Sequence, residues 1–241
     1  MLPSRSGYPM GPPAMLTHID IPSQFNRNSP GVVALGPDNT GQLLIELATR
    51  EAGLTSLSHV DVLDVGCGVR FTQALINRSI PIGSYTGIDV HQPLVEYLTV
   101  HVAEKDARFR YVQWDVQNAM YNPLGTVRLS DELELPVRAR FDLIWLFSVF
   151  THLEMGDAEA MLRVLRGHIR PEGRLMFSAF IDPDLDGWSD GVPGQPLLTA
   201  YFGLSTMKAM LSAAKWRLEK HQPRDPSLPI VDYFVCSPAD V

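Results

Sequence analysis

Three aspartates could bind one ligand, because each lies where a predicted strand ends. Asp64 and Asp89 end two apolar runs, and Asp115 follows a third. The carboxyl ends of parallel strands meet at one edge of a sheet, so we expect the three carboxylates to lie near one another. Asp89 could accept both hydroxyls of a ribose, and Asp115 could meet the amine of an adenine. Together they predict a site for a nucleoside that carries positive charge.

A glycine turn follows Asp64 immediately. Residues 62–71 read VLDVGCGVRF, in which a buried strand runs into Gly66, Cys67 and Gly68 and then into the start of a helix. The glycines let the backbone pass close to a ligand, and the helix N-terminus offers unpaired N–H groups. A carboxylate two residues before the first glycine suits a cationic amino acid better than a diphosphate. The turn therefore favours a ligand that joins a nucleoside to an amino acid.

A histidine that could act as a base follows the fourth predicted strand. The strand at residues 141–147 continues as SVFTHL, which brings His152 to the same edge of the sheet. An imidazole titrates near neutral pH and could remove a proton from a hydroxyl held there. We expect His152 to be the catalytic base and Phe147 to line the pocket of the reacting group. Helix capping or core hydrogen bonding by His152, and ordinary packing of Phe147, are the alternatives.

These residues need an alternating α/β framework, which the hydrophobic pattern predicts. Strands that alternate with helices across short connections indicate a parallel sheet with helices on both faces. The last two β-like runs have only a short connection, and we expect them to pair antiparallel. The predicted strands lie at residues 60–65, 85–89, 109–114, 141–147, 174–181, 216–221 and 230–236, and the predicted helices at 71–78, 94–104, 157–169 and 205–214.

The same motifs resemble the class I S-adenosylmethionine-dependent methyltransferases. The matching segments read DVGCG at 64–68, GIDV at 87–90, WDV at 114–116 and RPEG at 170–173. The resemblance implies a Rossmann-like, doubly wound α/β fold with helices on both faces of a seven-stranded sheet, mostly parallel with an antiparallel last strand. It implies S-adenosyl-L-methionine as cofactor, bound by Asp64, Gly66, Cys67, Gly68, Asp89, Val90, Asp115, Val116 and Phe147.

Arg70 departs from the family pattern, which often has a third glycine at this position. At the start of a helix, its side chain could reach the cofactor carboxylate or point to solvent, and we expect it to bind the cofactor. Two further segments, YNPLG at 121–125 and SVFTHL at 148–153, resemble a bacterial subgroup that modifies glycans or lipids. We therefore expect O-methylation of a small molecule, glycan or lipid, with transfer to nitrogen less favoured.

Composition argues against several other classes of protein. The chain has 241 residues and a formal net charge of −7, which disfavours a nucleic-acid partner. Its two cysteines form no CxxC pair, and no His/Asp/Glu cluster has the spacing of metal ligands, so we expect no metal. No stretch is apolar and long enough to span a membrane. We expect a reducing, cytoplasmic location, and the oligomeric state stays open.

Two segments flank the predicted site. Residues 1–37 are rich in proline and glycine, which predicts a flexible segment that could cap the cofactor, and the methyltransferase domain is expected at 38–241. The polar loop after residue 182 is long for a connection, and we expect it to cover the acceptor with Trp188 and Tyr201 as apolar walls.

Three other functions are alternatives to this one. An NAD-dependent oxidoreductase needs the pattern GxGxxG, but Phe71 stands where the third glycine belongs, and Asp64 fits a diphosphate poorly. A nucleic-acid methyltransferase commonly carries Asn/Asp-Pro-Pro-aromatic after the fourth strand, where residues 146–149 read LFSV. A non-catalytic S-adenosylmethionine-binding protein of the same fold stays open, because fold does not fix function.

Overall fold

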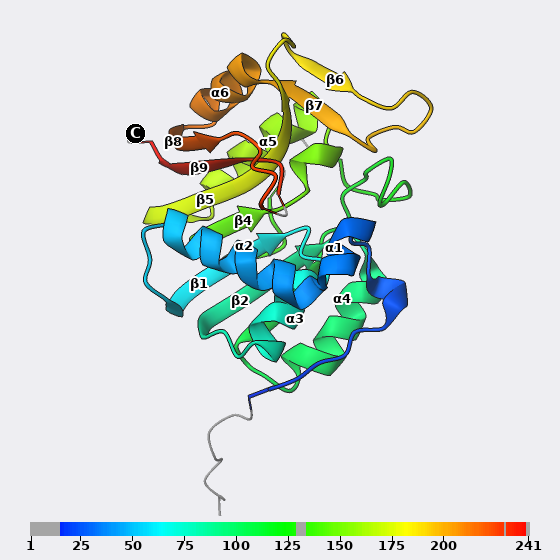
Figure 1. The fold of residues 1–241 in the computed structure, drawn as a ribbon, viewed down its shortest axis with the longest axis vertical. Coiled ribbons are helices and arrows are strands. Elements are labelled where there is room, and N and C mark those ends of the chain that lie inside the picture. Colours follow the sequence, from blue (N-terminus) through cyan, green and yellow to red (C-terminus); the bar gives the residue numbers. More distant parts are fainter. Residues whose placement is uncertain (1–14, 129–133, 229, 240–241) are drawn as a thin grey trace, which may run out of the picture.

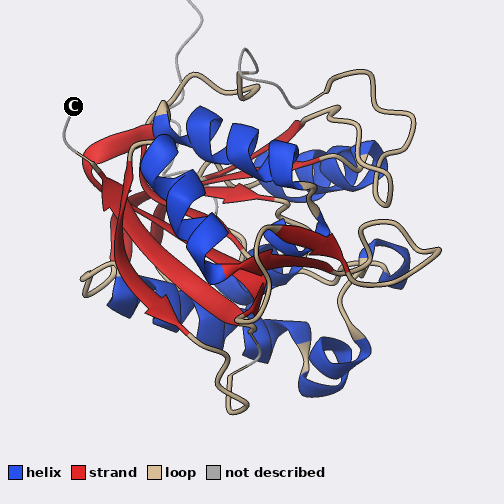
Figure 2. Ribbon diagram, turned by 90° about the horizontal axis from the view of Figure 1, so that it is seen from above, coloured by secondary structure: helices blue, strands red, loops and turns tan. Residues whose placement is uncertain are grey.

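The computed structural model describes residues 15–128, 134–228 and 230–239. A twisted sheet runs through the molecule, and helices lie on both sides of it (Figures 1 and 2). The strands are β1 (Leu57–Val65), β2 (Ile82–Asp89), β3 (Phe109–Gln113), β4 (Phe141–Leu146), β5 (Ile169–Asp182), β6 (Trp188–Asp190), β7 (Ala200–Gly203), β8 (Trp216–Gln222) and β9 (Asp232–Pro238). The helices are α1 (Pro30–Leu35), α2 (Pro37–Glu51), α3 (Arg70–Asn77), α4 (Gln92–Leu98), α5 (Met155–Arg166) and α6 (Leu204–Ala213), with shorter turns η1 (Ser23–Phe25), η2 (Thr99–Ala103) and η3 (Phe150–His152).

The order of the strands puts β1 at the centre. Strands β3, β2, β1, β4 and β5 lie side by side and are all parallel. Strand β9 pairs antiparallel with both β5 and β8. This confirms the doubly wound α/β fold and the antiparallel last strand. It also places the carboxyl ends of β1, β2 and β4 together at one edge of the sheet.

Two strands were not expected. The prediction of seven strands is corrected to nine among the described residues, because β6 and β7 form in the segment after residue 182 that was expected to be a loop. Strand β9 pairs with β5 only at residues 175–179, and β7 pairs with the last part of β5, where Phe180 lies opposite Tyr201. The end of β5 would otherwise leave its backbone groups unpaired on that side.

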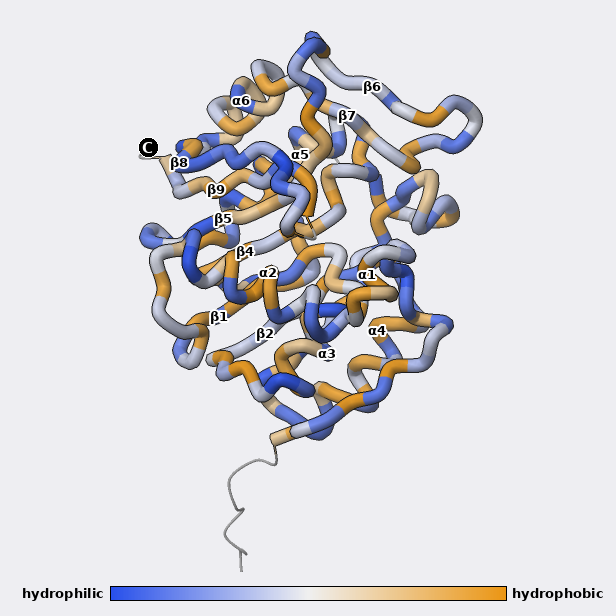
Figure 3. Tube along the Cα trace, in the orientation of Figure 1, coloured by the Kyte–Doolittle hydropathy of each residue, from blue (hydrophilic) through white to orange (hydrophobic). Residues whose placement is uncertain are grey.

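Different helices cover the two faces of the sheet, because successive residues of a strand point to opposite sides. In β1, Val62 packs with apolar residues of α2, α3 and α4, whereas Leu63 packs with those of α5 and α6. Figure 3 shows hydrophilic and hydrophobic stretches alternating along α2, as a helix with one buried side requires. The predicted helix–sheet–helix layers are therefore confirmed.

The N-terminal segment is folded against the domain where the structure describes it. The backbone of Ile19 donates to Asn77 Oδ1 at 2.7 Å and accepts from Asn77 Nδ2 at 3.0 Å, which attaches the segment to the end of α3. The chain then passes α4 and forms η1 and α1 near the carboxyl ends of the strands (Figure 1). Residues 23–25 and 30–35 of this segment are therefore helical, and residues 1–14 lie outside the described part.

The helix expected at residues 94–104 is shorter than its pattern indicates. Helix α4 ends at Leu98, and the chain continues as the π-helical turn η2. At this junction the Thr99 hydroxyl donates to the carbonyl of Val95 at 2.8 Å, so a side chain competes for a carbonyl of the helix. The spacing of apolar residues does not predict where an α-helix changes into a π-helical turn.

Candidate cofactor and acceptor site

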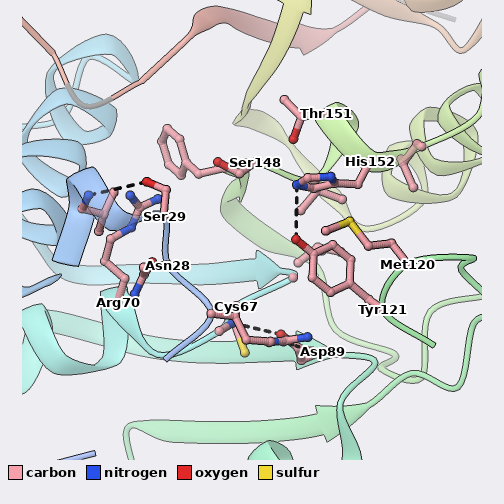
Figure 4. A pocket seen from close by; sticks show the side chains of 18 of the residues that line it. Asn28, Ser29, Cys67, Arg70, Asp89, Met120, Tyr121, Ser148, Thr151 and His152 are labelled. Atoms are coloured by element: carbon pink, nitrogen blue, oxygen red, sulfur yellow. Dashed lines mark hydrogen bonds and ion pairs between the residues drawn. The ribbon is translucent and has the colours of Figure 1, made fainter. Parts of the chain in front are cut away.

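A cavity of about 690 Å³ opens at the carboxyl ends of β1, β2 and β4. Its walls come from the N-terminal segment, the glycine turn, the end of β2, the segments after β3 and β4, and parts of the chain near residues 198 and 230. Figure 4 shows side chains from these distant segments facing one space. Most of the predicted site residues line it, namely Gly66, Cys67, Gly68, Arg70, Asp89, Val90, Val116, Phe147 and His152.

The turn after β1 depends on its glycines. Gly66 and Gly68 have φ values of 72° and 50°, in the left-handed region that favours glycine. A Cβ on Gly66 would lie 2.6 Å from Cγ2 of Val149, so a larger residue would clash with that side chain. The backbone N–H groups of Gly66 and Cys67 both donate to the carbonyl of Ile88, at 2.8 and 3.0 Å. The turn is therefore fastened to the end of β2, beside Asp89.

Asp89 is buried but keeps its carboxylate at the cavity. Its side chain is 3% exposed, and its Oδ2 accepts from the Gly68 N–H at 3.0 Å. Its Oδ1 accepts from the His91 N–H at 2.9 Å and from Arg27 Nη2 at 2.7 Å. A carboxylate offers about four acceptor positions, so these three donors leave room for about one more. Two ribose hydroxyls can bind only if one of the three donors leaves.

Arg27 is a site residue that the sequence did not reveal. It comes from the N-terminal segment, 62 positions before Asp89, and its guanidinium lies 5.3 Å from the ring centroid of Tyr121. Its side chain is 30% exposed, whereas that of Asp89 is nearly buried. No motif or periodicity marks residue 27, so only the folded chain shows that the N-terminal segment completes the cavity.

Asp64 lies under the glycine turn and does not line the cavity. Its side chain is 1% exposed, and Oδ2 accepts from the Tyr85 hydroxyl. Burial raises the pKa of this carboxyl to about 7, although Tyr85 and the charge of Arg70 lower it. The expected direct contact of Asp64 with the ligand therefore has no support in the structure, where its carboxyl is buried against Tyr85.

Asp115 is also displaced from its expected role. Its Oδ1 accepts from Asn122 Nδ2 at 2.9 Å, and its Oδ2 accepts from the N–H and hydroxyl of Thr126 at 3.1 and 2.6 Å. These hydrogen bonds lower the pKa of the Asp115 carboxyl. The carboxylate closes a turn outside the cavity lining, whereas its neighbours Trp114 and Val116 do line the cavity. The expected contact with an adenine amine therefore has no support in the structure.

Arg70 presents a buried positive charge to the cavity. The residue is only 8% exposed, and burial lowers the pKa of its guanidinium, an effect that the charge of Asp64 opposes. Within the described residues its guanidinium makes no hydrogen bond or ion pair, and it lies 5.2 Å from the ring centroid of Phe71. A buried cation without a paired anion is costly, so this side chain is suited to bind an anionic group of a ligand.

His152 lies at the opposite side of the cavity, in η3. Its Nδ1 is 2.9 Å from the carbonyl oxygen of Leu197, and because a carbonyl can only accept, Nδ1 carries the proton. Its Nε2 is then the unprotonated nitrogen, 3.3 Å from the hydroxyl of Tyr121. Burial lowers the pKa of His152 below its ordinary value of 6.5, so the imidazole is neutral at neutral pH. The structure thus places a neutral imidazole at the cavity, with its unprotonated nitrogen facing Tyr121.

The segment between β4 and η3 is held in an unusual conformation. Ser148 has a φ of 61°, which a residue with a side chain rarely adopts, and its N–H donates to Ser178 Oγ at 2.8 Å. The preceding residue, Phe147, lines the cavity and packs against Phe71 with ring centroids 5.2 Å apart. This bend directs the chain around the cavity and delivers His152 to it.

The described part of the chain holds neither a metal-binding cluster nor a helix that could span a membrane. No group of three or more His, Cys, Asp and Glu side chains there could hold a metal ion. No helix there has both the length and the apolar character needed to cross a bilayer. Cys67 and Cys236 are both buried and unpaired.

Comparison with known proteins adds to this geometry. Residues 63–175 match a protein family described as a methyltransferase domain. The fold is similar to that of magnesium protoporphyrin IX methyltransferase from Synechocystis PCC 6803 with bound SAM, at 12% identity over 90% of this chain and 89% of that chain, with a TM-score of 0.56.

Two further solved structures share the fold. The 1,6-didemethyltoxoflavin-N1-methyltransferase of Burkholderia thailandensis, with bound 1,6-didemethyltoxoflavin and S-adenosylhomocysteine, is 18% identical over 90% of this chain and 85% of that chain, with a TM-score of 0.57. The mitomycin 7-O-methyltransferase is 17% identical over 90% of this chain and 60% of that chain, with a TM-score of 0.52. The recognition made from the motifs is thus confirmed at two levels: residues 63–175 match the methyltransferase-domain family, and the chain has the class I methyltransferase fold.

Proposed function

We propose that the protein uses S-adenosylmethionine to methylate an oxygen of a small, largely apolar acceptor. One observation carries the proposal: a single cavity holds the glycine turn and Asp89 at one side and a neutral imidazole at the other. When bound, S-adenosylmethionine supplies a methyl group on a positively charged sulfur. The remaining tasks, which are binding, orientation and proton removal, fall to residues of this chain.

The cofactor side of the cavity has groups that match the parts of S-adenosylmethionine. Arg70 would bind the carboxylate, since it is a buried cation with no ion pair among the described residues. Asp89 would bind the ribose, and the glycine turn would let the backbone lie against the ligand. Val90, Val116 and Cys67 would supply apolar contacts. Neither Asp64 nor Asp115 is included in this set, because neither lines the cavity.

The acceptor side favours a small apolar molecule with a hydroxyl group. Phe147, Phe180 and Leu198 line the same cavity as His152, and they favour an aromatic or aliphatic acceptor. A neutral hydroxyl is a weak nucleophile, so a base that accepts its proton speeds its attack. His152 can accept this proton at Nε2. A nitrogen acceptor is the second candidate, because an amine can attack before it loses its proton.

We also propose a reducing, cytoplasmic setting, since both cysteines are buried and unpaired.

Calorimetry and a methyl-transfer assay together test this function. We expect S-adenosylmethionine and S-adenosylhomocysteine to bind the purified chain and NADH not to bind. Methyl transfer is then measured as S-adenosylhomocysteine release with paired acceptors, such as 7-hydroxycoumarin and 7-aminocoumarin, and with hydroxylated sugars and lipids. We expect release with hydroxyl acceptors. NADH binding more tightly than S-adenosylhomocysteine would support an oxidoreductase instead, and cofactor binding without turnover of any acceptor would indicate a non-catalytic protein.

A further inference from the structure

Tyr121 faces the base across the acceptor side of the cavity, and no motif assigns it a role. It lies in the segment between β3 and β4, 31 positions before His152, and the two rings meet edge to face with centroids 5.1 Å apart. In Figure 4 the hydroxyl of Tyr121 and the imidazole point toward one another. Both residues line the cavity, so the pair is open to an acceptor.

The direction of the hydrogen bond between the two residues is fixed by their surroundings. Because the carbonyl of Leu197 takes the Nδ1 proton of His152, Nε2 can only accept. The Tyr121 hydroxyl must therefore donate to Nε2, across 3.3 Å. Its oxygen keeps lone pairs that can accept a hydrogen bond from another hydroxyl. A molecule in the cavity can thus reach the base through Tyr121.

The backbone holds Tyr121 in place independently of its hydroxyl. Asn118 Oδ1 accepts from the N–H groups of Met120 and Tyr121, both at 3.0 Å. Asn118 Nδ2 donates to the carbonyl of His152, also at 3.0 Å. One asparagine therefore ties the segment of Tyr121 to the segment of His152. Replacing the hydroxyl alone should leave this connection intact.

We propose that Tyr121 is a catalytic residue that relays the acceptor proton to His152, an inference that rests on the proposed methyl transfer to oxygen. The acceptor oxygen forms a bond to the methyl carbon, and the carbon–sulfur bond breaks with its electron pair left on sulfur. The acceptor proton passes to Tyr121 Oη while the Tyr121 proton passes to His152 Nε2. The products are a methyl ether, a neutral thioether and an imidazolium, which returns its proton to water.

Arg27 supports this role of Tyr121. Its guanidinium lies 5.3 Å from the centroid of the Tyr121 ring. During the relay, negative charge builds up briefly on the phenol oxygen and its ring. A cation over the ring stabilises that charge. The same contact limits the motion of the ring, so the hydroxyl stays directed at Nε2.

The variant Tyr121→Phe tests the relay, with Tyr233→Phe as its matched control. Tyr233 lies on β9, its hydroxyl donates to Glu51 Oε1 at 3.1 Å, and it does not line the cavity. With 7-hydroxycoumarin or the best hydroxyl acceptor of the panel, we expect Tyr121→Phe to lower kcat by at least about 100-fold, as for loss of a proton-transfer group. The KM for the cofactor should stay within about twofold, and Tyr233→Phe should match the wild type.

Nitrogen NMR tests the hydrogen bond between Tyr121 and His152 without any acceptor. In the wild type bound to S-adenosylhomocysteine, the ¹⁵N resonance of His152 Nε2 should show an accepted hydrogen bond, and in Tyr121→Phe it should shift downfield toward a nitrogen without a donor. An unchanged resonance, or a kcat lowered less than about tenfold, would overturn the relay. Failure of the wild type to bind S-adenosylhomocysteine would instead refute the proposed function, so the two failures are distinct.

Discussion

The ion pair between Arg27 and Asp89 leads to a prediction with an unusual sign. In the structure, Arg27 Nη2 lies 2.7 Å from Asp89 Oδ1, and two backbone N–H groups take further acceptor positions of the carboxylate. If both ribose hydroxyls bind this carboxylate, Arg27 must give up its hydrogen bond. Replacing Arg27 by methionine removes the competitor. We therefore expect Arg27→Met to bind S-adenosylhomocysteine more tightly than the wild type.

The size of the effect follows from the bond that is lost. A hydrogen bond to a charged group contributes about 1.5–3 kcal/mol. Arg27 is 30% exposed, and solvent screens its charge, so the lower end of that range applies. About 1.4 kcal/mol corresponds to tenfold in affinity, so the dissociation constant should fall about tenfold. The folded protein should become less stable at the same time, because Asp89 stays buried with fewer donors, and Tm should drop by several degrees.

Calorimetric titration and thermal unfolding measure both effects on the same samples. Lys208→Met is the matched control for charge, since Lys208 lies on α6 and does not line the cavity. It should leave the affinity for S-adenosylhomocysteine unchanged. If Arg27→Met binds S-adenosylhomocysteine equally or more weakly, Arg27 contacts the cofactor rather than competing with it, and the reasoning about Asp89 is wrong.

Three further predictions concern the remaining polar groups of the site. His152→Ala should lower kcat about 100-fold or more with an unchanged affinity for S-adenosylhomocysteine, and equal turnover of the variant would remove His152 from the mechanism. The kcat/KM of the wild type should stay level down to about pH 6.5, because burial lowers the pKa of His152 below that value. Arg70→Met should weaken S-adenosylhomocysteine about tenfold but leave 5′-methylthioadenosine, which lacks the carboxylate, unaffected, and equal losses for both ligands would contradict the assignment. Burial raises the pKa of Asp64 from 3.8 to about 7, so the folded state holds this proton more tightly than the unfolded state. The resulting contribution to the free energy of unfolding is fully present below about pH 3.8 and is lost as pH rises through about 7. It amounts to about 4 kcal/mol. Denaturant unfolding should therefore show that wild type loses stability relative to Asp64→Asn between pH 4 and pH 8, and a constant difference would exclude Asp64 as the cause.

The parts of the fold and site that follow a local pattern could be predicted from the sequence. The glycine turn is visible because a bend between a strand and a helix needs residues that adopt positive φ, and Gly66 and Gly68 do so. Asp89 ends the apolar run of the second strand, and the carboxyl ends of parallel strands are where ligands bind. His152 follows the fourth strand by the same logic. In each case the sequence neighbours of the residue determine its place.

The missed parts depend on contacts between distant residues or on competition for one group. Arg27 meets Asp89 only after the N-terminal segment has packed along α3 and α4. Asp115 follows a strand end just as Asp89 does, but Asn122 and Thr126 lie within reach and take its oxygens. Asp64 lies so deep beneath the turn that its carboxyl meets Tyr85 instead of the cavity. A strand-end pattern gives the position of a carboxylate but not its hydrogen-bond partners.

Contacts run from the cofactor side to the acceptor side through Asp89, Arg27, Tyr121 and His152. If a ribose takes Oδ1 of Asp89, Arg27 loses its anion and keeps only its place over the Tyr121 ring. Its charge is then available where negative charge builds up during proton transfer. A cation over a partly exposed ring contributes about 0.5–1 kcal/mol, which corresponds to a factor of about 2–5 in rate. Arg27→Met should therefore bind S-adenosylhomocysteine more tightly and yet transfer methyl groups more slowly, a combination that simple loosening of the cavity would not produce.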